Sequence, residues 1–248
     1  MNLSKYSIVL LSAGVGRRLK TNGKKNPKCL LRIKKKTLIE NLLNILKKRK
    51  AKKITIIVGY KKKILINYLK KIKKLDLNYV EISKFRKYGH SYSWHCFKKE
   101  WVKQKKPMLL FHTDIFFDPL FLDNILKSKK KDIIGTKSQK IKNLKKNSFV
   151  VKTNQKNRIL SIQRFLINPV LNREILGINK FSKKTTEKIF NFMDKYLLND
   201  KKKLSWEDFI DSFIKKTKTP IYSLKNQNFY WTNINRYQDY LSAKKFKI

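Results

Sequence analysis

The sequence predicts an α/β protein: a doubly wound, mostly parallel, Rossmann-like sheet with helices on both faces and a small β-rich insertion. Short, almost wholly apolar strands alternate with amphipathic helices over residues 1–136, which is typical of parallel strands covered on both faces. Residues 137–180 instead carry short strands separated by polar turns, and we expect the insertion there. With 248 residues and no linker rich in Pro, Gly or Ser, the chain 1–248 is expected to form a single domain.

The first half is expected to alternate strand and helix from its first apolar run, residues 6–12. Thr37 is expected to cap the first helix, because a hydroxyl can accept a hydrogen bond from an amide of the first turn. Asp118 should cap a later helix in which Pro119 takes the first position. The other strands are expected at 53–59, 77–83, 107–113 and 132–136, and the helices at 38–49, 64–72 and 119–126, with one more ending at residue 101.

The second half is expected to be more mixed. Its β-rich insertion, which we expect to act as a lid, should comprise strands 148–153, 159–165 and 171–179. Two helices follow at 185–198 and 206–215, and Ser205 with an acid three residues later is typical of a helix cap. Strands at 220–224 and 229–234 and a helix at 236–245 are expected to complete the chain.

The formal net charge of +46 is the most unusual feature of the composition. Such an excess is typical of proteins that bind nucleic acids or anionic surfaces. The lysines, however, are spread over the whole chain and accompany abundant Asn and Ile, a mix that an AT-rich genome produces through codon bias. We therefore favour a lysine-rich surface and expect no specific nucleic-acid partner, with a non-catalytic nucleic-acid-binding protein as the alternative of a different class.

Several other site types find no support. No apolar run reaches membrane-spanning length and no signal peptide is recognisable, so we expect a cytoplasmic protein without a membrane span. Cys29 and Cys96 stand in no paired motif, which argues against a disulfide framework or a zinc site. His90, His95 and His112 follow no metal-ligand spacing, and we expect them to be hydrogen-bonded or at the surface.

The stretch that ends the first strand predicts an anion site. Gly14 and Gly16 permit a sharp turn whose amides can face a phosphate, and Arg17, Arg18 and Lys28 add positive charge. A P-loop is excluded because no Gly-Lys-Ser/Thr follows. A dinucleotide fingerprint is excluded because Leu19 replaces its third glycine and lysines occupy the place of its acidic residue.

The loop Ser12-Ala13-Gly14-Val15-Gly16-Arg17-Arg18, with Asn26-Pro27-Lys28 downstream, resembles the signature of the nucleotidyltransferases that make sugar nucleotides and CDP-alcohols. The resemblance implies transfer of a nucleoside monophosphate from an NTP to a phosphorylated acceptor, with release of pyrophosphate. It implies that Arg18 holds the β- and γ-phosphates and that Lys28 bridges the α-phosphate and the acceptor, both as catalytic groups. Nucleotide binding is assigned to a wider set: Ser12, Ala13, Gly14, Gly16, Arg17, Gly59 and Ser91.

The same resemblance implies a magnesium site. In the family a strand ends in an aspartate that holds Mg²⁺, and residues 109–113 followed by Asp114 have that form. A second ligand, Asp or Asn, follows a tryptophan near the C-terminus, where this chain has Trp231 and Asn235. Asn235 is expected to be either that ligand or the cap of the last helix. Because asparagine is a neutral ligand, binding of the metal would depend mainly on the negative charges of Asp114 and the triphosphate.

The acceptor is expected to bind in the second half, 137–248, while residues 1–136 form the nucleotide-binding half. The candidate aromatic faces for a quaternary ammonium, which could equally be core residues, are Tyr92, Trp94, Tyr230 and Trp231. Glu207 or Asp208 is a candidate carboxylate for the same cation, with helix capping as the alternative role of this segment. The chain resembles the phosphocholine cytidylyltransferase branch, which favours CTP with phosphocholine or another aminoalcohol phosphate or phosphonate. A sugar-1-phosphate is the alternative acceptor. Either product would serve as a precursor of a cell-surface polysaccharide or lipid; the oligomeric state stays open.

Overall fold

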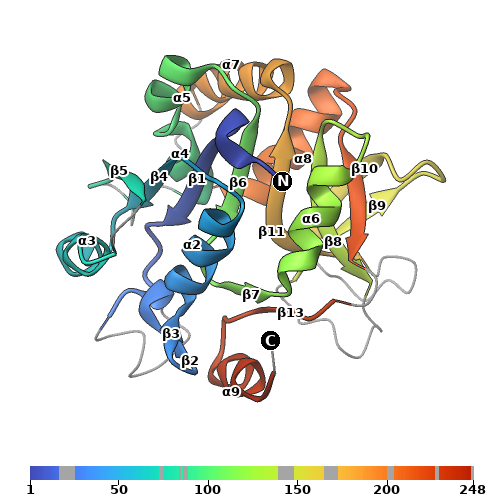
Figure 1. Ribbon diagram of the computed structural model, residues 1–248. Coiled ribbons are helices and arrows are strands. Elements are labelled where there is room, and N and C mark those ends of the chain that lie inside the picture. The colour runs from blue at the N-terminus through green and yellow to red at the C-terminus, as the bar shows by residue number, and fades with distance from the viewer. Residues whose placement is uncertain are drawn as a thin grey trace.

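The fold is built on one twisted, nine-stranded sheet (Figure 1). The computed structural model describes residues 1–16, 26–72, 75–83, 85, 89–138, 148–164, 173–199, 204–226 and 229–246. Along its main path the sheet has the strand order β10-β9-β11-β6-β1-β4-β5, and β8 pairs with both β11 and β12. The strands are β1 (Ser7–Ser12), β4 (Lys53–Val58), β5 (Asp76–Glu81), β6 (Met108–His112), β8 (Ile133–Ser138), β9 (Phe149–Thr153), β10 (Ile159–Arg164), β11 (Arg173–Phe181) and β12 (Tyr222–Asn226).

Four parallel strands form the half that the alternating pattern predicted. β1 lies between β4 and β6 and is parallel to both, and β4 pairs in parallel with β5. β1, β4 and β6 are buried along almost their whole length, and because they are parallel their carboxyl ends meet at one edge of the sheet. That edge is where doubly wound folds bind their ligands.

The β-rich region is part of the same sheet. β11 is antiparallel to β6, β8 and β9, and β10 is antiparallel to β9, so these strands continue the parallel half without forming a separate layer. β9 and β10 are joined by a short connection and form an antiparallel hairpin, because parallel neighbours would need a long crossover. Residues 139–147 and 165–172 of the expected lid lie outside the described residues.

Helices cover both faces of the sheet, as predicted. On one face, α2, α3 and α6 pack against side chains such as Ile8 and Leu10 of β1; on the other, α4, α5, α7 and α8 pack against Val9 (Figure 1). The alternation along β1 follows from the two-residue period of a strand. The helices are α2 (Leu38–Lys48), α3 (Lys62–Leu69), α4 (His90–His95), α5 (Lys98–Gln104), α6 (Pro119–Lys127), α7 (Lys183–Asn199), α8 (Trp206–Thr217) and α9 (Tyr237–Lys245).

The predicted caps are present. Thr37 and Glu40 form a capping box at the start of α2: the Thr37 hydroxyl accepts from the Glu40 amide at 3.2 Å, and the Thr37 amide donates to the Glu40 carboxylate at 2.6 Å. Asp118 accepts from the amide of Leu120 at 2.9 Å at the start of α6. Ser205 caps α8 in the same way. These local signals act within one turn of helix, so the sequence alone specifies them.

Two small sheets were not predicted. β2 (Arg32–Ile33) and β3 (Lys36–Thr37) form a short hairpin before α2, next to the 3-10 turn η3 (Lys28–Leu30); a second 3-10 turn, η1 (Leu3–Lys5), precedes β1. β7 (Ile115–Phe117) pairs antiparallel with β13 (Trp231–Asn233). This second pairing matters for function because it brings the end of the chain to the carboxyl end of β6. Among the described residues, no helix is both long and apolar enough to cross a membrane.

Candidate active site

A cleft opens at the carboxyl ends of β1 and β6. It lies between the loop that follows β1, the turn η3, the start of α4 and the link between β13 and α9. It is lined by Leu11, Ser12, Ala13, Gly14, Val15, Gly16, Lys28, Cys29, His90, Ser93, His112, Thr113, Asp114 and Asn235. The cleft therefore contains the described part of the predicted loop, the nearby Lys28, and two predicted residues from distant parts of the chain: Asp114 and Asn235.

The glycine loop is held by its neighbours. Gly16 has φ +64°, a left-handed conformation that favours glycine, and a Cβ there would lie 3.1 Å from the Cβ of Lys28. The loop therefore packs directly on the Lys28 side chain. At its other end, the amide of Tyr60, the residue after Gly59, donates to the Ala13 carbonyl at 3.2 Å. Gly59 thus supports the loop from the end of β4 and is not among the lining residues.

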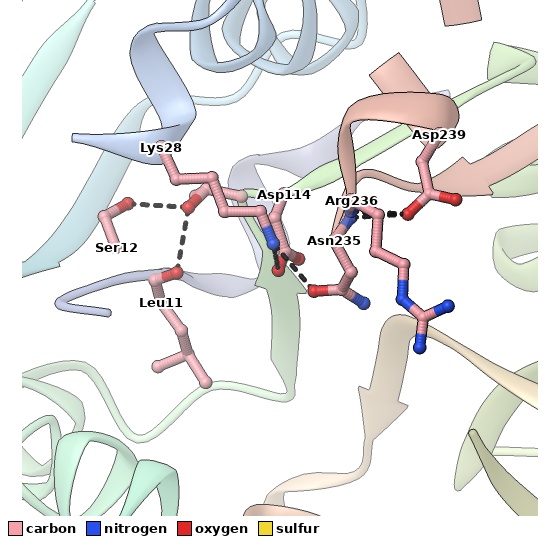
Figure 2. A network of polar contacts seen from close by, with 8 residues as sticks. Leu11, Ser12, Lys28, Asp114, Asn235, Arg236 and Asp239 are labelled. Atoms are coloured by element: carbon pink, nitrogen blue, oxygen red, sulfur yellow. Dashed lines mark hydrogen bonds and ion pairs between the residues drawn. The ribbon is translucent and has the colours of Figure 1, made fainter. Parts of the chain in front are cut away.

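Lys28 joins the two predicted metal ligands. Its ammonium Nζ lies 2.6 Å from Oδ2 of Asp114 and 2.8 Å from Oδ1 of Asn235 (Figure 2). Lys28 and Asn235 are 207 residues apart in the sequence. One cation is thus bound by two oxygens that are far apart in the sequence and adjacent in the fold.

The link after β13 positions Asn235. The amide of Ile234 donates to the backbone carbonyl of Asp114 at 2.8 Å, which extends the pairing of β13 with β7. The buried carboxylate of Asp239 then accepts from the amides of Asn235 and Arg236 at 2.9 and 2.7 Å (Figure 2). Asp239 performs the capping of α9, so the Asn235 side chain is directed at Lys28 instead of at the helix.

Asp114 is ionised in this arrangement. Burial by itself would raise the pKa of the Asp114 carboxyl, but the adjacent Lys28 ammonium outweighs burial, and the net effect holds this pKa below its usual range. Only one of the carboxylate oxygens is used by Lys28. The other, Oδ1, is buried and has no hydrogen-bond partner within the described residues. A second positive group directed at Asp114 would satisfy it.

The residues present fit a divalent cation of the magnesium type. Carboxylate and amide oxygens are the ligands such ions prefer, and both Asp114 and Asn235 already bind the cation of Lys28. The described residues contain no group of three or more His, Cys, Asp or Glu side chains that could hold a metal. An ion at Asp114 and Asn235 would therefore complete its shell with oxygens of water or of a bound ligand.

Sequence reasoning missed Ser93, Thr113 and Cys29, which also line the cleft. The Thr113 hydroxyl accepts from Ser12 Oγ at 3.1 Å and donates to the Leu11 carbonyl at 2.9 Å, which ties the end of β6 to the end of β1. Burial raises the pKa of the Cys29 thiol to about 12, so this thiol is neutral. No pattern in the sequence marks these residues, because they come from three separate elements: Thr113 follows β6, Ser93 belongs to α4 and Cys29 to η3.

His112 departs from the expectation that the histidines would be hydrogen-bonded or at the surface. It is buried, its Nε2 lacks a partner among the described residues, and burial lowers its pKa to about 4. Its ring lies edge-on to Trp206, with 5.3 Å between centroids. His112 is thus a neutral group inside the cleft. His95 follows the expectation: it bonds to Asp194 at 2.8 Å.

The start of α8 places Glu207 near the cleft. A Cβ at Gly89 would lie 1.7 Å from the Leu204 carbonyl oxygen, so the start of α4 and the chain before α8 are in a contact that only glycine permits. Ser91 Oγ donates to the same carbonyl at 3.0 Å. Burial, with a smaller contribution from the charge of Asp114, raises the pKa of the Glu207 carboxyl to about 7.

Two of the predicted acceptor residues are core residues. Trp94 has no exposed surface; it stacks on Phe181 with 5.7 Å between centroids, and its Nε1 points to Met108. Trp231 is buried, and its Nε1 donates to the Leu176 carbonyl at 3.0 Å. Of the two alternatives for these rings, an acceptor face or the core, the structure shows the core for both. Aromatic side chains near a turn pack into the core when the sheet leaves a large apolar space beneath them.

The other predicted residues have mixed outcomes. Ser12, Ala13, Gly14 and Gly16 line the cleft. Tyr92, a residue of α4, is half-buried and packs against the core outside the lining of the cleft, and the Ser91 hydroxyl is directed at the chain before α8. Arg17 and Arg18 lie outside the described residues.

Fold and site together define a class: a doubly wound α/β enzyme that handles phosphate groups at the carboxyl edge of its sheet. Comparison with known proteins makes this specific. The family model of the nucleotidyl transferases matches residues 7–248, and the chain belongs to this family. It is thus a nucleotidyltransferase that acts on phosphorylated substrates, as the glycine loop with Pro27-Lys28 indicated.

The relatives fall into two groups. The chain is 25% identical over 233 residues to a choline-phosphate cytidylyltransferase of Streptococcus pneumoniae, a match that covers 94% of both chains. It is 27% identical over 240 residues to the bifunctional protein GlmU of Methanocaldococcus jannaschii, of which it covers 54%. The chain thus spans about half of that second relative.

Solved structures confirm the fold. The CTP:phosphocholine cytidylyltransferase LicC of Streptococcus pneumoniae matches with a TM-score of 0.80 and 23% identity, covering 97% of this chain and 98% of that one. An inositol-1-phosphate CTP transferase of T. maritima matches with a TM-score of 0.79 and 18% identity, covering 99% and 97%. At these identities the likeness concerns architecture alone.

Proposed function

We propose that this chain transfers CMP from CTP to a phosphorylated aminoalcohol, such as phosphocholine, with Mg²⁺ as cofactor. The choice of acceptor rests on Glu207, a partly buried carboxyl whose pKa is raised by burial and, to a smaller extent, by the charge of Asp114. Burial favours the protonated form of this carboxyl, and a cationic acceptor beside it would stabilise the ionised form instead. The full-length similarity to a choline-phosphate cytidylyltransferase supports the same choice and supports CTP as donor.

Positioning and charge would do most of the chemical work. An oxygen of the acceptor phosphate attacks the α-phosphorus, the bond to the bridging oxygen breaks, and pyrophosphate leaves with the electron pair. The acceptor phosphate is already ionised, so no residue needs to remove a proton. The glycine-loop amides and Arg18 would hold the triphosphate, and Lys28 would bridge the α-phosphate and the acceptor.

The surroundings of Lys28 suit this chemistry. Neutral Cys29 and neutral His112 leave Lys28 as the dominant positive charge of this wall without adding a competing base. Asp114 and Asn235 would hold Mg²⁺, which, when bound, neutralises charge on the phosphates. In this scheme residues 1–136 serve the nucleotide and residues 137–248 the acceptor, since Asn235 and Glu207 both come from the second part. The cytoplasmic location and the role in precursor synthesis stay predictions.

The deciding experiment is pyrophosphate release with Mg²⁺ across four NTPs and a panel of acceptors: phosphocholine, phosphoethanolamine, glucose-1-phosphate and glucosamine-1-phosphate. We expect the highest kcat/KM for CTP with phosphocholine. Asp114→Ala should abolish turnover while circular dichroism shows a folded protein. Turnover by Asp114→Ala at the wild-type rate would overturn the site, and no release with any pair would overturn the function.

Glu207→Gln tests the acceptor. We expect KM for phosphocholine to rise about tenfold, the equivalent of about 1.4 kcal/mol for one lost ionic contact, with little change for CTP. Glu187→Gln, which removes a carboxylate from the exposed side of α7, is the matched control and should change neither value. Equal effects of both substitutions would refute a direct role for Glu207.

A sugar-1-phosphate is the second candidate acceptor. It is favoured by the 26% identity over 242 residues to a bifunctional sugar-1-phosphate nucleotidylyltransferase/acetyltransferase of Sulfurisphaera tokodaii, of which the chain covers 55%. A preference for either sugar phosphate in the panel, unaffected by Glu207→Gln, would establish it in place of phosphocholine.

A further inference from the structure

The Lys28 ammonium lies between the two residues that the proposed function assigns to the metal. Its distances of 2.6 and 2.8 Å to Asp114 and Asn235 are those of a cation bound by both oxygens at once. In the proposed function these same oxygens hold Mg²⁺. A divalent ion held by Asp114 and Asn235 would compete with the ammonium, because Asn235 offers a single side-chain oxygen, already bound to Lys28 Nζ, and the two cations repel each other at this distance.

The charge balance points the same way. Asp114 supplies one negative charge and Asn235 none, and Lys28 already supplies one positive charge. No group of three or more acidic, His or Cys side chains lies among the described residues to attract an ion independently. With Lys28 in place, a divalent ion would meet a neutral pair; with Lys28 withdrawn, it would meet an ionised carboxylate whose Oδ1 lacks a partner within the described residues.

The loop that would bind the nucleotide contacts Lys28 directly. Gly16 packs on the Lys28 stem so closely that a Cβ at position 16 would lie 3.1 Å from the Lys28 Cβ and 3.6 Å from its Cδ. The loop that would bind the triphosphate and the lysine that blocks the cation position are therefore in contact. A triphosphate in the cleft offers the ammonium several anionic oxygens in exchange for one carboxylate, which favours its withdrawal.

We infer that Lys28 acts as a built-in placeholder for the metal ion, so that the chain binds a divalent cation well only after a triphosphate has drawn Lys28 away from Asp114 and Asn235. This inference rests on the metal assignment of the proposed function. In this scheme the binding of the nucleotide and the binding of the metal depend on each other, and the metal by itself binds weakly. Lys28 thus has two positions, one against the metal ligands and one against the phosphates.

Mn²⁺ binding, followed by the loss of the free Mn²⁺ signal in electron paramagnetic resonance, tests the inference without turnover. The wild-type chain should bind Mn²⁺ at least about tenfold more weakly alone than with α,β-methylene CTP, a donor that cannot be cleaved at the reacting bond. The affinity of that analogue for free Mn²⁺ is measured separately and subtracted. Tight Mn²⁺ binding by the protein alone would overturn the inference.

Lys28→Met should bind Mn²⁺ without nucleotide about tenfold or more tightly than wild type, and Lys28→Met with Asp114→Asn should lose that gain. Lys62→Met is the matched control: it removes a lysine that pairs with the surface carboxylate of Glu81, and it should not change Mn²⁺ affinity. If Lys28→Met does not fold, Lys28→Gln replaces it. An unchanged affinity in the folded variant would overturn the inference.

Pyrophosphate release by the same wild-type preparation separates the two proposals. Turnover together with unchanged Mn²⁺ affinity in Lys28→Met means that the placeholder role is wrong and the function stands. Gained affinity in Lys28→Met without turnover for any NTP and acceptor means that the placeholder role stands and the proposed reaction is wrong.

Discussion

Glu207 should make the stability of this protein depend on pH in a direction opposite to that of most carboxylates. Its pKa is about 7 in the folded protein, against an ordinary value of 4.5. A raised pKa means that the folded state keeps a proton on Glu207 at pH values where the unfolded state has released it. The contribution of this carboxyl to the unfolding free energy is therefore complete below about pH 4.5 and is lost as the pH rises through about 7. Replacing the carboxyl by a neutral amide in Glu207→Gln removes this dependence.

The magnitude follows from the difference between the two pKa values, about 2.5, which corresponds to about 3.4 kcal/mol at roughly 1.36 kcal/mol per pKa unit. Part of the Glu207 side chain reaches solvent, which screens its charge, and the neighbouring Ser205 hydroxyl stabilises the ionised form. We therefore expect about half of this value, ~1.5 kcal/mol. Asp208 and Asp114, the other carboxylates acting on this group, both add to the effect.

The assay is urea unfolding of wild type, Glu207→Gln and the surface control Glu187→Gln, in EDTA and at several values between about pH 4.5 and 8. Every other titrating group is shared, so the difference in unfolding free energy between wild type and Glu207→Gln isolates this carboxyl. We expect the unfolding free energy of wild type to fall by ~1.5 kcal/mol relative to that of Glu207→Gln as the pH rises across this range. The pH dependence of Glu187→Gln should be the same as that of wild type. Parallel curves for wild type and Glu207→Gln would refute the burial argument.

Three further substitutions test the supports of the site. Gly89→Ala forces a Cβ against the Leu204 carbonyl and should cost about 1–3 kcal/mol of stability in urea unfolding and raise the acceptor KM more than the CTP KM; equal stability would show that the contact yields freely. Asp239→Asn weakens the hydrogen bonds that the amides of Asn235 and Arg236 donate to this side chain, so Asn235 should be misplaced. We expect kcat to fall by a larger factor than the CTP KM rises; an unchanged kcat would argue that Asn235 needs no such support. Thr37→Ala removes one partner of the capping box and should cost about 1 kcal/mol of stability with both KM values unchanged, and a change in either KM would contradict a purely local role.

The sequence by itself determined the elements whose signals are local. The capping box of Thr37, the Asp118 cap and the apolar run of β1 each depend on neighbours within a few residues, so their interactions can be recognised without the fold. The glycine loop also belongs here, since its turn and its downstream Pro27-Lys28 lie in one short segment. These local features were sufficient to predict the fold class and the family.

Tertiary structure decided which residues share the cleft. Asn235 reaches Lys28 only because β13 pairs with β7, a strand of three residues that no periodicity could reveal. The burial of Trp94 in the core and the position of Glu207 near Asp114 depend on how α4 and α8 pack at the end of the sheet. Such contacts join segments on the order of a hundred residues apart, and their energy comes from burial and strand pairing, which no short stretch of sequence contains. For the same reason the placeholder position of Lys28 became visible only in the folded chain.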